Sequence, residues 1–253
     1  MAQDAGGDFL LRIEDIDTTR SRPAFEAAIR DDLAWLGLDW PEPVLRQSEH
    51  GPRYVAALER LAALGLTYPC RCTRAEIRAA LSAPQEGLTQ PAPYPGTCRG
   101  RPMADMRRGD ALRLDLSRAL DRAGALGYEE VGPLHPGRHA IDPAALLAGC
   151  GDVVLARRDI GVAYHLAVVV DDAHQRISHV VRGADLWPST PLHRLLLALL
   201  DLPVPVWHHH RLIRDAQGRR LAKRDDARAL ATLRAEGATR AEVRALVGRK
   251  YPR

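Results

Sequence analysis

The chain has 253 residues, of which 46% are apolar and 27% are charged, and these values are ordinary for a globular protein with one sizeable core and a small insertion. The formal net charge of +4 is compatible with a polyanionic partner, but it is far below that of a protein that coats nucleic acid. No apolar stretch approaches the roughly eighteen residues of a membrane span, and the start of the chain does not resemble a signal peptide. We therefore expect a cytoplasmic protein and, by default, a monomer.

The first predicted elements are a strand and two helices. The apolar run from Phe9 to Ile13 predicts a buried strand, and an acidic turn follows it at once. Apolar residues at steps of three and four predict a helix that begins near Pro23 and ends near Gly37. The same spacing predicts a second helix that starts near Tyr54 and is closed by Gly65.

Strands and helices alternate through the middle of the chain, as in α/β folds. Thr73 and Glu76 form a predicted capping box, as do Thr239 and Glu242, and Thr190 before Pro191 predicts a helix cap. The segment 84–102 is rich in Pro and Gly and predicts a loop or insertion. We expect strands at 112–116, 153–155 and 177–181, helices at 163–170 and through Leu200, and a hairpin within 211–222.

The segment from Arg12 to Asp17, RIEDID, places carboxylates at the carboxyl end of the first predicted strand. Open α/β sheets bind ligands at this end of their strands, so the segment is a candidate substrate site. The alternative is an acidic turn in contact with solvent.

The stretch LLRIEDIDTTR resembles a segment of the class I glutamyl-tRNA synthetases and of the related glutamyl-queuosine tRNA(Asp) synthetases, and the resemblance continues almost to the end of the chain. It implies a Rossmann-like class I synthetase catalytic domain of the α/β class, with a small zinc-binding insertion and a short helical C-terminal tail. It also implies that Glu14 binds the ammonium group of L-glutamate, which suits a carboxylate.

Two further segments carry the resemblance, YHLAVVVDD from Tyr164 and VVRGADL up to Leu186. In the family, a tyrosine and an arginine line the glutamate pocket, which implies this role for Tyr164 and Arg182. A guanidinium fork suits a carboxylate, because two parallel N–H groups can meet two oxygens. Taken singly, each residue is more readily interpreted as structural than as functional, since buried Tyr and surface Arg are common.

Lysine is rare in this chain, with only Lys223 and Lys250 among 36 basic residues. The segment RRLAKRDD around Lys223 resembles the family's lysine signature loop, with alanine where serine is frequent. The resemblance implies that Lys223 contacts the phosphates of ATP, bound with Mg²⁺, and stabilises charge during adenylation. The alternative is a solvated basic turn.

Three of the four cysteines, Cys70, Cys72 and Cys98, lie within one short region, and this clustering indicates a metal site in a reducing compartment. The pattern resembles the zinc site of the glutamyl-queuosine enzymes, which use three cysteines and a tyrosine, and implies Tyr94 as the fourth ligand of one structural Zn²⁺. A water molecule as fourth ligand, or no metal at all, is the alternative.

Three consecutive histidines, His208, His209 and His210, cannot all face one ion if they lie on a strand, because neighbouring side chains point to opposite faces. We interpret them as structural or as neighbours of ATP.

The resemblance also predicts the organisation of the chain. Only thirteen residues precede Glu14, whereas a complete βαβ unit needs about thirty, so we expect the first strand and helix of the catalytic domain to be missing. The predicted boundaries are 1–66 for the first part of the catalytic domain, 67–110 for the zinc-binding insertion, 111–225 for the acceptor-binding region and second catalytic part with the lysine loop, and 226–253 for the helical tail.

The function implied is ATP-dependent activation of L-glutamate and its transfer to queuosine in tRNA(Asp). Only about thirty residues follow Lys223, which is well short of the anticodon-binding domain of a standard glutamyl-tRNA synthetase. Two rivals remain: an incomplete glutamyl-tRNA synthetase, and a catalytically inactive, zinc-dependent RNA-binding relative.

Overall fold

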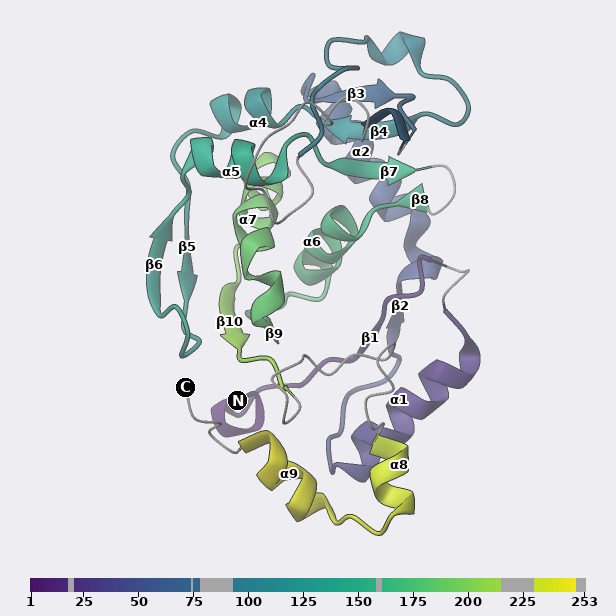
Figure 1. Ribbon diagram of the computed structural model, residues 1–253, viewed down its shortest axis with the longest axis vertical. Coiled ribbons are helices and arrows are strands. Elements are labelled where there is room, and N and C mark those ends of the chain that lie inside the picture. Colours follow the sequence, from purple (N-terminus) through teal and green to yellow (C-terminus); the bar gives the residue numbers. More distant parts are fainter. Residues whose placement is uncertain (18–20, 74, 78–92, 158–160, 215–229, 249–253) are drawn as a thin grey trace. The chain divides into compact units, whose positions relative to one another are not determined.

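The computed structural model describes residues 1–17, 21–73, 75–77, 93–157, 161–214 and 230–248, which Figure 1 shows as a coloured ribbon. The chain forms two compact units. The first unit combines Met1–Glu49 with Arg211–Arg253, and the second is His50–His210.

Among its described residues, the first unit contains a two-stranded parallel sheet and three α-helices. Its elements are β1 (Arg12–Ile13), α1 (Pro23–Trp35), β2 (Leu45–Arg46), α8 (Leu230–Ala235) and α9 (Arg240–Gly248). The predicted strand at 9–13 is confirmed over its last two residues, and the predicted helix from Pro23 is confirmed as α1.

The apolar face of α1 is poorly covered by the described residues. Phe25 is 48% exposed and Ile29 is 39% exposed. Polar and ring contacts fix the helix instead, because Arg234 of α8 bonds Asp31 over 2.5 Å and lies 5.3 Å from the ring centroid of Trp35. Helical periodicity therefore predicted the element correctly, but it did not predict burial of its face.

The second unit contains two four-stranded sheets and five helices among the described residues. Its helices are α2 (Gly51–Ala63), α4 (Leu116–Ala123), α5 (Pro143–Cys150), α6 (Tyr164–His174) and α7 (Thr190–Leu199). Its strands are β3 (Thr67–Cys70), β4 (Ala111–Leu114), β5 (Gly127–Glu130), β6 (Gly137–Ala140), β7 (Val154–Arg157), β8 (Gly161–Val162), β9 (His179–Gly183) and β10 (Val206–His210).

The two sheets differ in direction. The sheet β3-β4-β7-β8 is antiparallel throughout, whereas in β6-β5-β10-β9 the strand β10 runs parallel to both β5 and β9. Figure 1 shows α6 and α7 side by side between the two sheets. Leucines of α7 supply much of the core, and Leu192, Leu195 and Leu196 are fully buried.

A buried carboxylate joins α2 to α6. Asp171 is fully buried, and it accepts hydrogen bonds from the Tyr54 hydroxyl over 2.8 Å and from Arg53 over 3.3 Å. Burial of the carboxylate is tolerated because both of its oxygens have donors.

The predicted strands and helices of the second unit are confirmed where they fall on described residues. The predicted strands at 112–116, 153–155 and 177–181 correspond to β4, β7 and β9, and the helices correspond to α2, α6 and α7. Both capping boxes form, with Thr73 N–H donating to Glu76 over 2.7 Å and Thr239 N–H donating to Glu242 over 2.7 Å. Most of the predicted hairpin at 211–222 and part of the loop at 84–102 lie outside the described residues.

The predicted cap at Thr190 is wrong. Thr190 is the first residue of α7, Ser189 occupies the cap position, and neither side chain caps the helix. The Thr190 hydroxyl instead accepts a hydrogen bond from Arg182 over 2.8 Å. A tertiary contact with a charged donor has replaced the local bond that the motif predicted.

Candidate active site and metal centre

Arg182 is positioned by the parallel part of the second sheet. It lies on β9, directly opposite His209 of β10 in the strand register. Its Nε donates to His209 Nε2 over 2.9 Å, and its Nη1 donates to His193 Nδ1 over 2.9 Å. Its Nη2 donates to Thr190 and to the Leu186 carbonyl over 2.8 and 3.3 Å. Four of the five guanidinium N–H groups therefore bond the protein itself.

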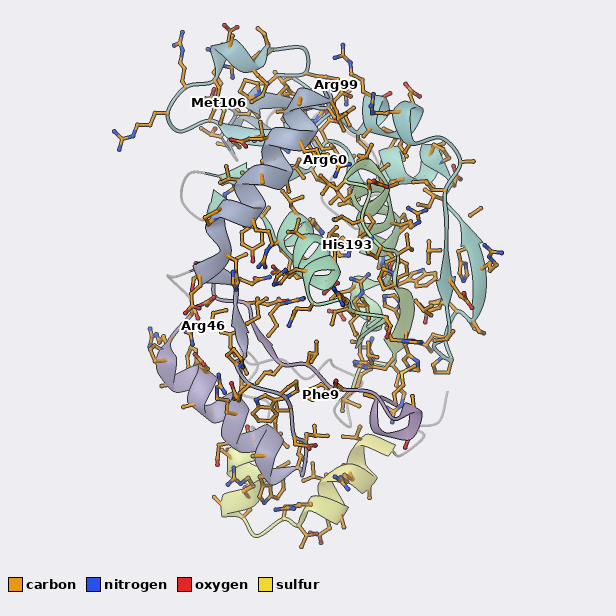
Figure 2. The ribbon with its side chains drawn as sticks, turned by 180° about the vertical axis from the view of Figure 1, so that it is seen from behind. Phe9, Arg46, Arg60, Arg99, Met106 and His193 are labelled. Carbon is orange, nitrogen blue, oxygen red and sulfur yellow. The ribbon has the colours of Figure 1, made fainter. Side chains whose placement is uncertain are left out.

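These contacts fix the tautomers of two histidines. His209 accepts from Arg182 at Nε2, so its Nδ1 carries the proton and donates to Glu130 over 2.6 Å. His193 accepts at Nδ1, so its Nε2 donates to His165 Nδ1 over 3.0 Å. Figure 2 marks His193 among the side chains of the second unit. The result is a continuous hydrogen-bonded chain from Glu130 through Arg182 to His165.

The electrostatics of this network favour one anion and one cation with neutral histidines. Burial opposes ionisation of Glu130, but hydrogen bonds from the N–H groups of His209 and Gly132 outweigh it and lower its pKa. Burial, and then the charge of Arg182, lower the pKa of His165 and lower that of His193 still further. Protonating these histidines would place positive charges against the guanidinium.

Tyr164 and Arg182, which the sequence assigns to one pocket, both contact His193. The Tyr164 ring centroid lies 6.0 Å from that of His193, and Tyr164 is 37% exposed at the start of α6. Burial lowers the pKa of Arg182, and the nearby Tyr164 and Asp172 oppose this effect. Because its donors are engaged, and Tyr164 adds a side-chain hydrogen bond to the guanidinium, Arg182 offers an incoming carboxylate its charge rather than a free fork.

Two carboxylates of the acidic turn after β1, Glu14 and Asp15, have different surroundings. Asp15 is buried, and it accepts hydrogen bonds from Ser48 N–H and Ser48 Oγ over 2.9 and 2.7 Å. Burial alone would raise the pKa of Asp15, but the Ser48 hydrogen bonds and Arg46 lower it. Glu14 is exposed, and among the described residues Arg12 pairs with it over 3.3 Å, which leaves its carboxylate accessible. Asp15 is structural, and Glu14 is free to bind a ligand.

The predicted glutamate site includes residues from both units, since Glu14 belongs to the first and Tyr164 and Arg182 belong to the second. Its complete geometry therefore stays a prediction. Lys223 and its loop lie outside the described residues, so the predicted ATP contact stays a prediction as well.

The consecutive histidines of β10 behave as the strand argument predicts. His209 is fully buried, His208 is half-buried and His210 is exposed. His209 bonds Glu130 and Arg182, so it is the structural member of the three.

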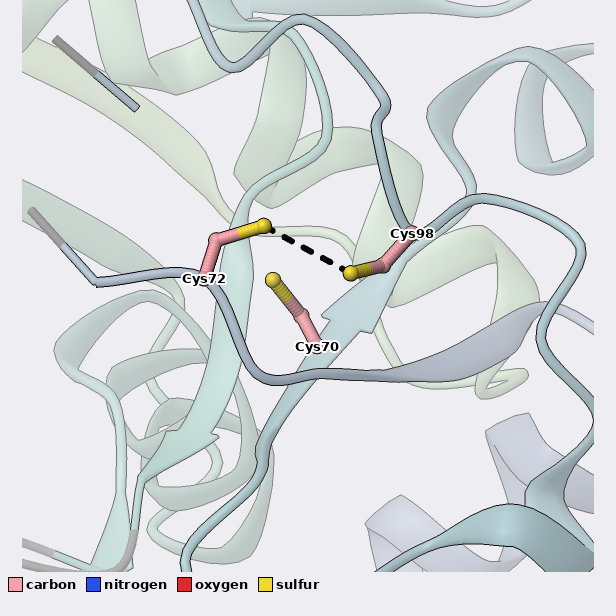
Figure 3. Close-up of side chains that lie close together, drawn as sticks. All are labelled: Cys70, Cys72 and Cys98. Atoms are coloured by element: carbon pink, nitrogen blue, oxygen red, sulfur yellow. Dashed lines mark hydrogen bonds between the residues drawn. The ribbon is translucent and has the colours of Figure 1, made fainter. Parts of the chain in front are cut away.

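The predicted metal ligands come together in the second unit. Figure 3 shows the sulfur atoms of Cys70, Cys72 and Cys98 pointing toward one another, and all three lie within 4.8 Å of each other. The Tyr94 hydroxyl lies 3.4 Å from the Cys70 sulfur and 3.5 Å from the Cys72 sulfur. Tetrahedral zinc with Zn–S bonds of about 2.3 Å needs ligand atoms roughly 3.8 Å apart, so these four residues fit the ion.

Backbone geometry holds Tyr94 against the cysteines. The Cys98 N–H donates to the Tyr94 hydroxyl oxygen over 2.8 Å, and Tyr94 forms an isolated bridge with Gly151. Gly151 has a φ of +57°, and a Cβ there would lie 2.8 Å from the Pro93 side chain. Only glycine permits this close approach.

The thiols differ in how readily they ionise. Burial raises the pKa of Cys72 to about 11. Burial also opposes ionisation of Cys98, but hydrogen bonds from the Arg71 backbone, Tyr94 and Cys72 lower its pKa to about 7. Cys98 therefore ionises more readily than Cys72, and binding of a divalent metal would displace protons from the thiols.

A cavity of about 770 Å³ adjoins the cluster, and its described lining includes Arg71, Arg113 and Arg157 with Cys70 and Cys72. None of the described lining residues is acidic. The charge of this surface suits an anionic ligand such as a phosphate.

Sequence reasoning missed several residues around these sites. Glu130 and His193 support Arg182, and Asp152 accepts hydrogen bonds from Tyr68 and Arg99 beside the cysteines. His193 is the one detectable case, because it is a lone histidine in the apolar helix α7.

Comparison with known proteins gives the family. The model of the catalytic domain of class I tRNA synthetases (E and Q) matches residues 1–251. A glutamyl-Q tRNA(Asp) synthetase of Rhodobacter capsulatus is 54% identical over 98% of this chain and 90% of its own length. One from Nocardia farcinica is 45% identical over 97% of this chain and 75% of its own.

Solved structures agree at the level of the fold. The glutamate-tRNA synthetase of Elizabethkingia anophelis is 28% identical, with a TM-score of 0.69 over 87% of this chain. The chain covers 46% of that structure. The chain thus belongs to the class I tRNA synthetases of the glutamate and glutamine type and, within them, to the glutamyl-Q tRNA(Asp) synthetase family, as the sequence predicted.

Membership in this family confirms the predicted α/β synthetase fold and the predicted class of enzyme, an aminoacyl-tRNA synthetase-type ligase. Among the described residues, no helix is long and apolar enough to cross a membrane. The predicted domain boundaries stay a prediction.

Proposed function

We propose that this protein activates L-glutamate with ATP and Mg²⁺ to glutamyl-adenylate and transfers the glutamyl group to queuosine in tRNA(Asp). The observation that carries the proposal is the 54% identity over 98% of the chain to a glutamyl-Q tRNA(Asp) synthetase. The activation step needs no nucleophile of the enzyme, because the glutamate α-carboxylate attacks the α-phosphate of ATP and pyrophosphate leaves.

Four residues would bind and orient the reactants. Glu14 accepts hydrogen bonds from the glutamate ammonium group, while Tyr164 and Arg182 meet its side-chain carboxylate. The rigid surroundings of Arg182 support this role, since a fixed cation selects an anion of matching length without reorganising. Lys223 follows the ATP phosphates and stabilises the charge that develops on them.

The Cys70, Cys72, Cys98 and Tyr94 cluster would hold one structural Zn²⁺. The close approach of three sulfur atoms and a phenol oxygen supports this assignment. A bound zinc ion links β3 to the loop that carries Tyr94 and Cys98, and so orders the surface beside the arginine-lined cavity. The charge of that cavity is consistent with an RNA partner. We further propose a monomeric, cytoplasmic enzyme.

Glutamate-dependent ATP–pyrophosphate exchange by the zinc-loaded chain tests the activation step. We expect exchange with glutamate and not with glutamine or aspartate, and loss of exchange in Lys223→Ala. Tight binding of tRNA without any exchange would favour an inactive RNA-binding protein instead. Exchange followed by charging of tRNA(Glu) would favour the incomplete glutamyl-tRNA synthetase.

A further inference from the structure

Arg113 of β4 is a buried cation beside the cysteine cluster. Arg113 is 7% exposed, and its Nη1 donates to the Asp152 carbonyl over 2.7 Å. Its Nε has no hydrogen-bond partner among the described residues. Its guanidinium carbon lies 3.8 Å from the ring centroid of Tyr94, in a stacked cation–π contact.

The carboxylate of Asp152 forms no ion pair with Arg113. Asp152 is buried, and its carboxylate accepts from Tyr68, Arg99 and the Leu116 N–H over 2.5, 2.8 and 3.0 Å. Arg113 therefore meets the backbone of Asp152 rather than its charge. No described carboxylate forms an ion pair with Arg113, and an uncompensated buried charge is costly.

The cysteine cluster lies at the hydroxyl end of the Tyr94 ring, whose face Arg113 covers. Arg113 covers the face of Tyr94, whose hydroxyl contacts the sulfur atoms of Cys70 and Cys72. Arg113 and Cys70 also line the same cavity on adjacent strands. The guanidinium is thus placed to interact with negative charge on the sulfur atoms through a medium of low dielectric.

We propose that Arg113 is the counter-cation of this metal centre and that it also fixes the plane of the Tyr94 ring. Three thiolates around a divalent ion carry one net negative charge, and the guanidinium neutralises that charge in the folded protein. Arg113 is a positioning residue in this role and is not itself a ligand. The inference rests on the proposed zinc site.

The test measures the zinc affinity of the full-length wild type and of three variants by competition with a chromogenic chelator. Arg113→Met removes the charge, Arg113→Lys keeps the charge without the flat guanidinium, and Arg107→Met removes an exposed arginine of the preceding loop. We expect Arg113→Met to bind zinc about 10–100-fold more weakly, as for other supporting residues around metals. Arg113→Lys should recover most of that loss, and Arg107→Met should bind as the wild type does.

A second readout separates weak binding from a changed site. The absorption spectrum of the Co²⁺-loaded Arg113→Met chain, at saturating Co²⁺, should keep the tetrahedral thiolate bands of the wild type. If Arg113→Met does not fold, Arg113→Gln, which can still donate to the Asp152 carbonyl, replaces it. Wild-type affinity in Arg113→Met, or equal weakening by Lys and Met, would overturn the role of charge. A wild-type chain that binds no zinc would overturn the metal site as well.

Discussion

A half-buried arginine, Arg182, and a buried arginine, Arg113, stand in opposite surroundings in the second unit. Arg182 uses four N–H groups on protein acceptors, and a buried carboxylate, Glu130, completes its network through His209. Arg113 has one hydrogen bond, one aromatic ring and no ion-pair partner among the described residues. The first site is complete within the protein, whereas we propose that the second is completed by a negatively charged metal cluster beside it.

The difference indicates where each site gets its order. The Arg182 network is built on strands β9 and β10 and on helix α7, so its geometry is present before any ligand arrives. The cysteine cluster joins the end of β3 to a loop, and metal binding would supply much of its order.

The largest expected effect follows from breaking the complete site. Arg182→Met removes the charge that we assign to glutamate binding. Truncating one partner of a hydrogen-bonded charge pair, here the arginine that meets the substrate carboxylate, costs about 2–5 kcal/mol, so kcat/KM for glutamate should fall at least about 30-fold. Pyrophosphate exchange at varied glutamate concentration measures it.

Arg194→Met is the matched control for this prediction. Arg194 lies on α7, and it donates to the Gly127 carbonyl over 2.9 Å, outside the Arg182 network. An equal loss in both variants would show that the effect is one of folding rather than of glutamate binding.

Breaking the second site should remove the metal and spare the first. Cys98→Ser replaces a thiolate whose pKa is already lowered to about 7, and we expect at least about a tenfold loss of zinc affinity. Elemental analysis after dialysis reports the bound zinc. Cys150→Ser should retain the metal, because Cys150 lies outside the cluster; retention of zinc by Cys98→Ser would remove that residue from the ligand set.

Glu130→Gln tests the Arg182 network indirectly, because Glu130 contacts Arg182 only through His209. The NH₂ group of the Gln amide would face the N–H at Nδ1 of His209, so two donors would meet. If His209 carried its proton on Nε2 instead, that N–H would face the Nε–H donor of Arg182. An unsatisfied buried group costs about 1–3 kcal/mol, so the free energy of unfolding should fall and the KM for glutamate should rise more than kcat falls. Urea unfolding and exchange kinetics measure the two effects, with the exposed Glu129→Gln as control.

The smallest expected effect is a pH dependence. The folded pKa values of His193 and His209 are lowered, so below the ordinary histidine pKa of about 6.5 the unfolded chain binds more protons. Stability is therefore complete above this pH and is lost as the pH falls, with a slope of up to about 1.4 kcal/mol per pH unit for each histidine.

Urea unfolding at pH 5 to 8 measures this slope. His193→Gln keeps an acceptor for Arg182 but does not titrate, so its slope below pH 6.5 should be shallower by one proton. An unchanged slope would show that His193 is not neutralised by the network.

The sequence predicted the elements of the fold well, because helices such as α1 and α2 carry apolar residues at steps of three and four. The sequence also predicted that Cys70, Cys72, Cys98 and Tyr94 form one cluster, since the resemblance to a known zinc site indicated the fourth residue. It did not predict the partners of Arg182, because Glu130, His193 and His209 lie on three different elements and meet only through tertiary packing. Thr190 matched a helix cap but bonds Arg182, so a local motif gave way to a stronger charged donor.

The decisive measurement is transfer of labelled glutamate by the zinc-loaded chain to three RNAs: tRNA(Asp) bearing queuosine, the same tRNA without queuosine, and tRNA(Glu). We predict ATP-dependent labelling of the queuosine-bearing tRNA(Asp) alone. Labelling of tRNA(Glu), or equal labelling of tRNA(Asp) with and without queuosine, would contradict the proposed function.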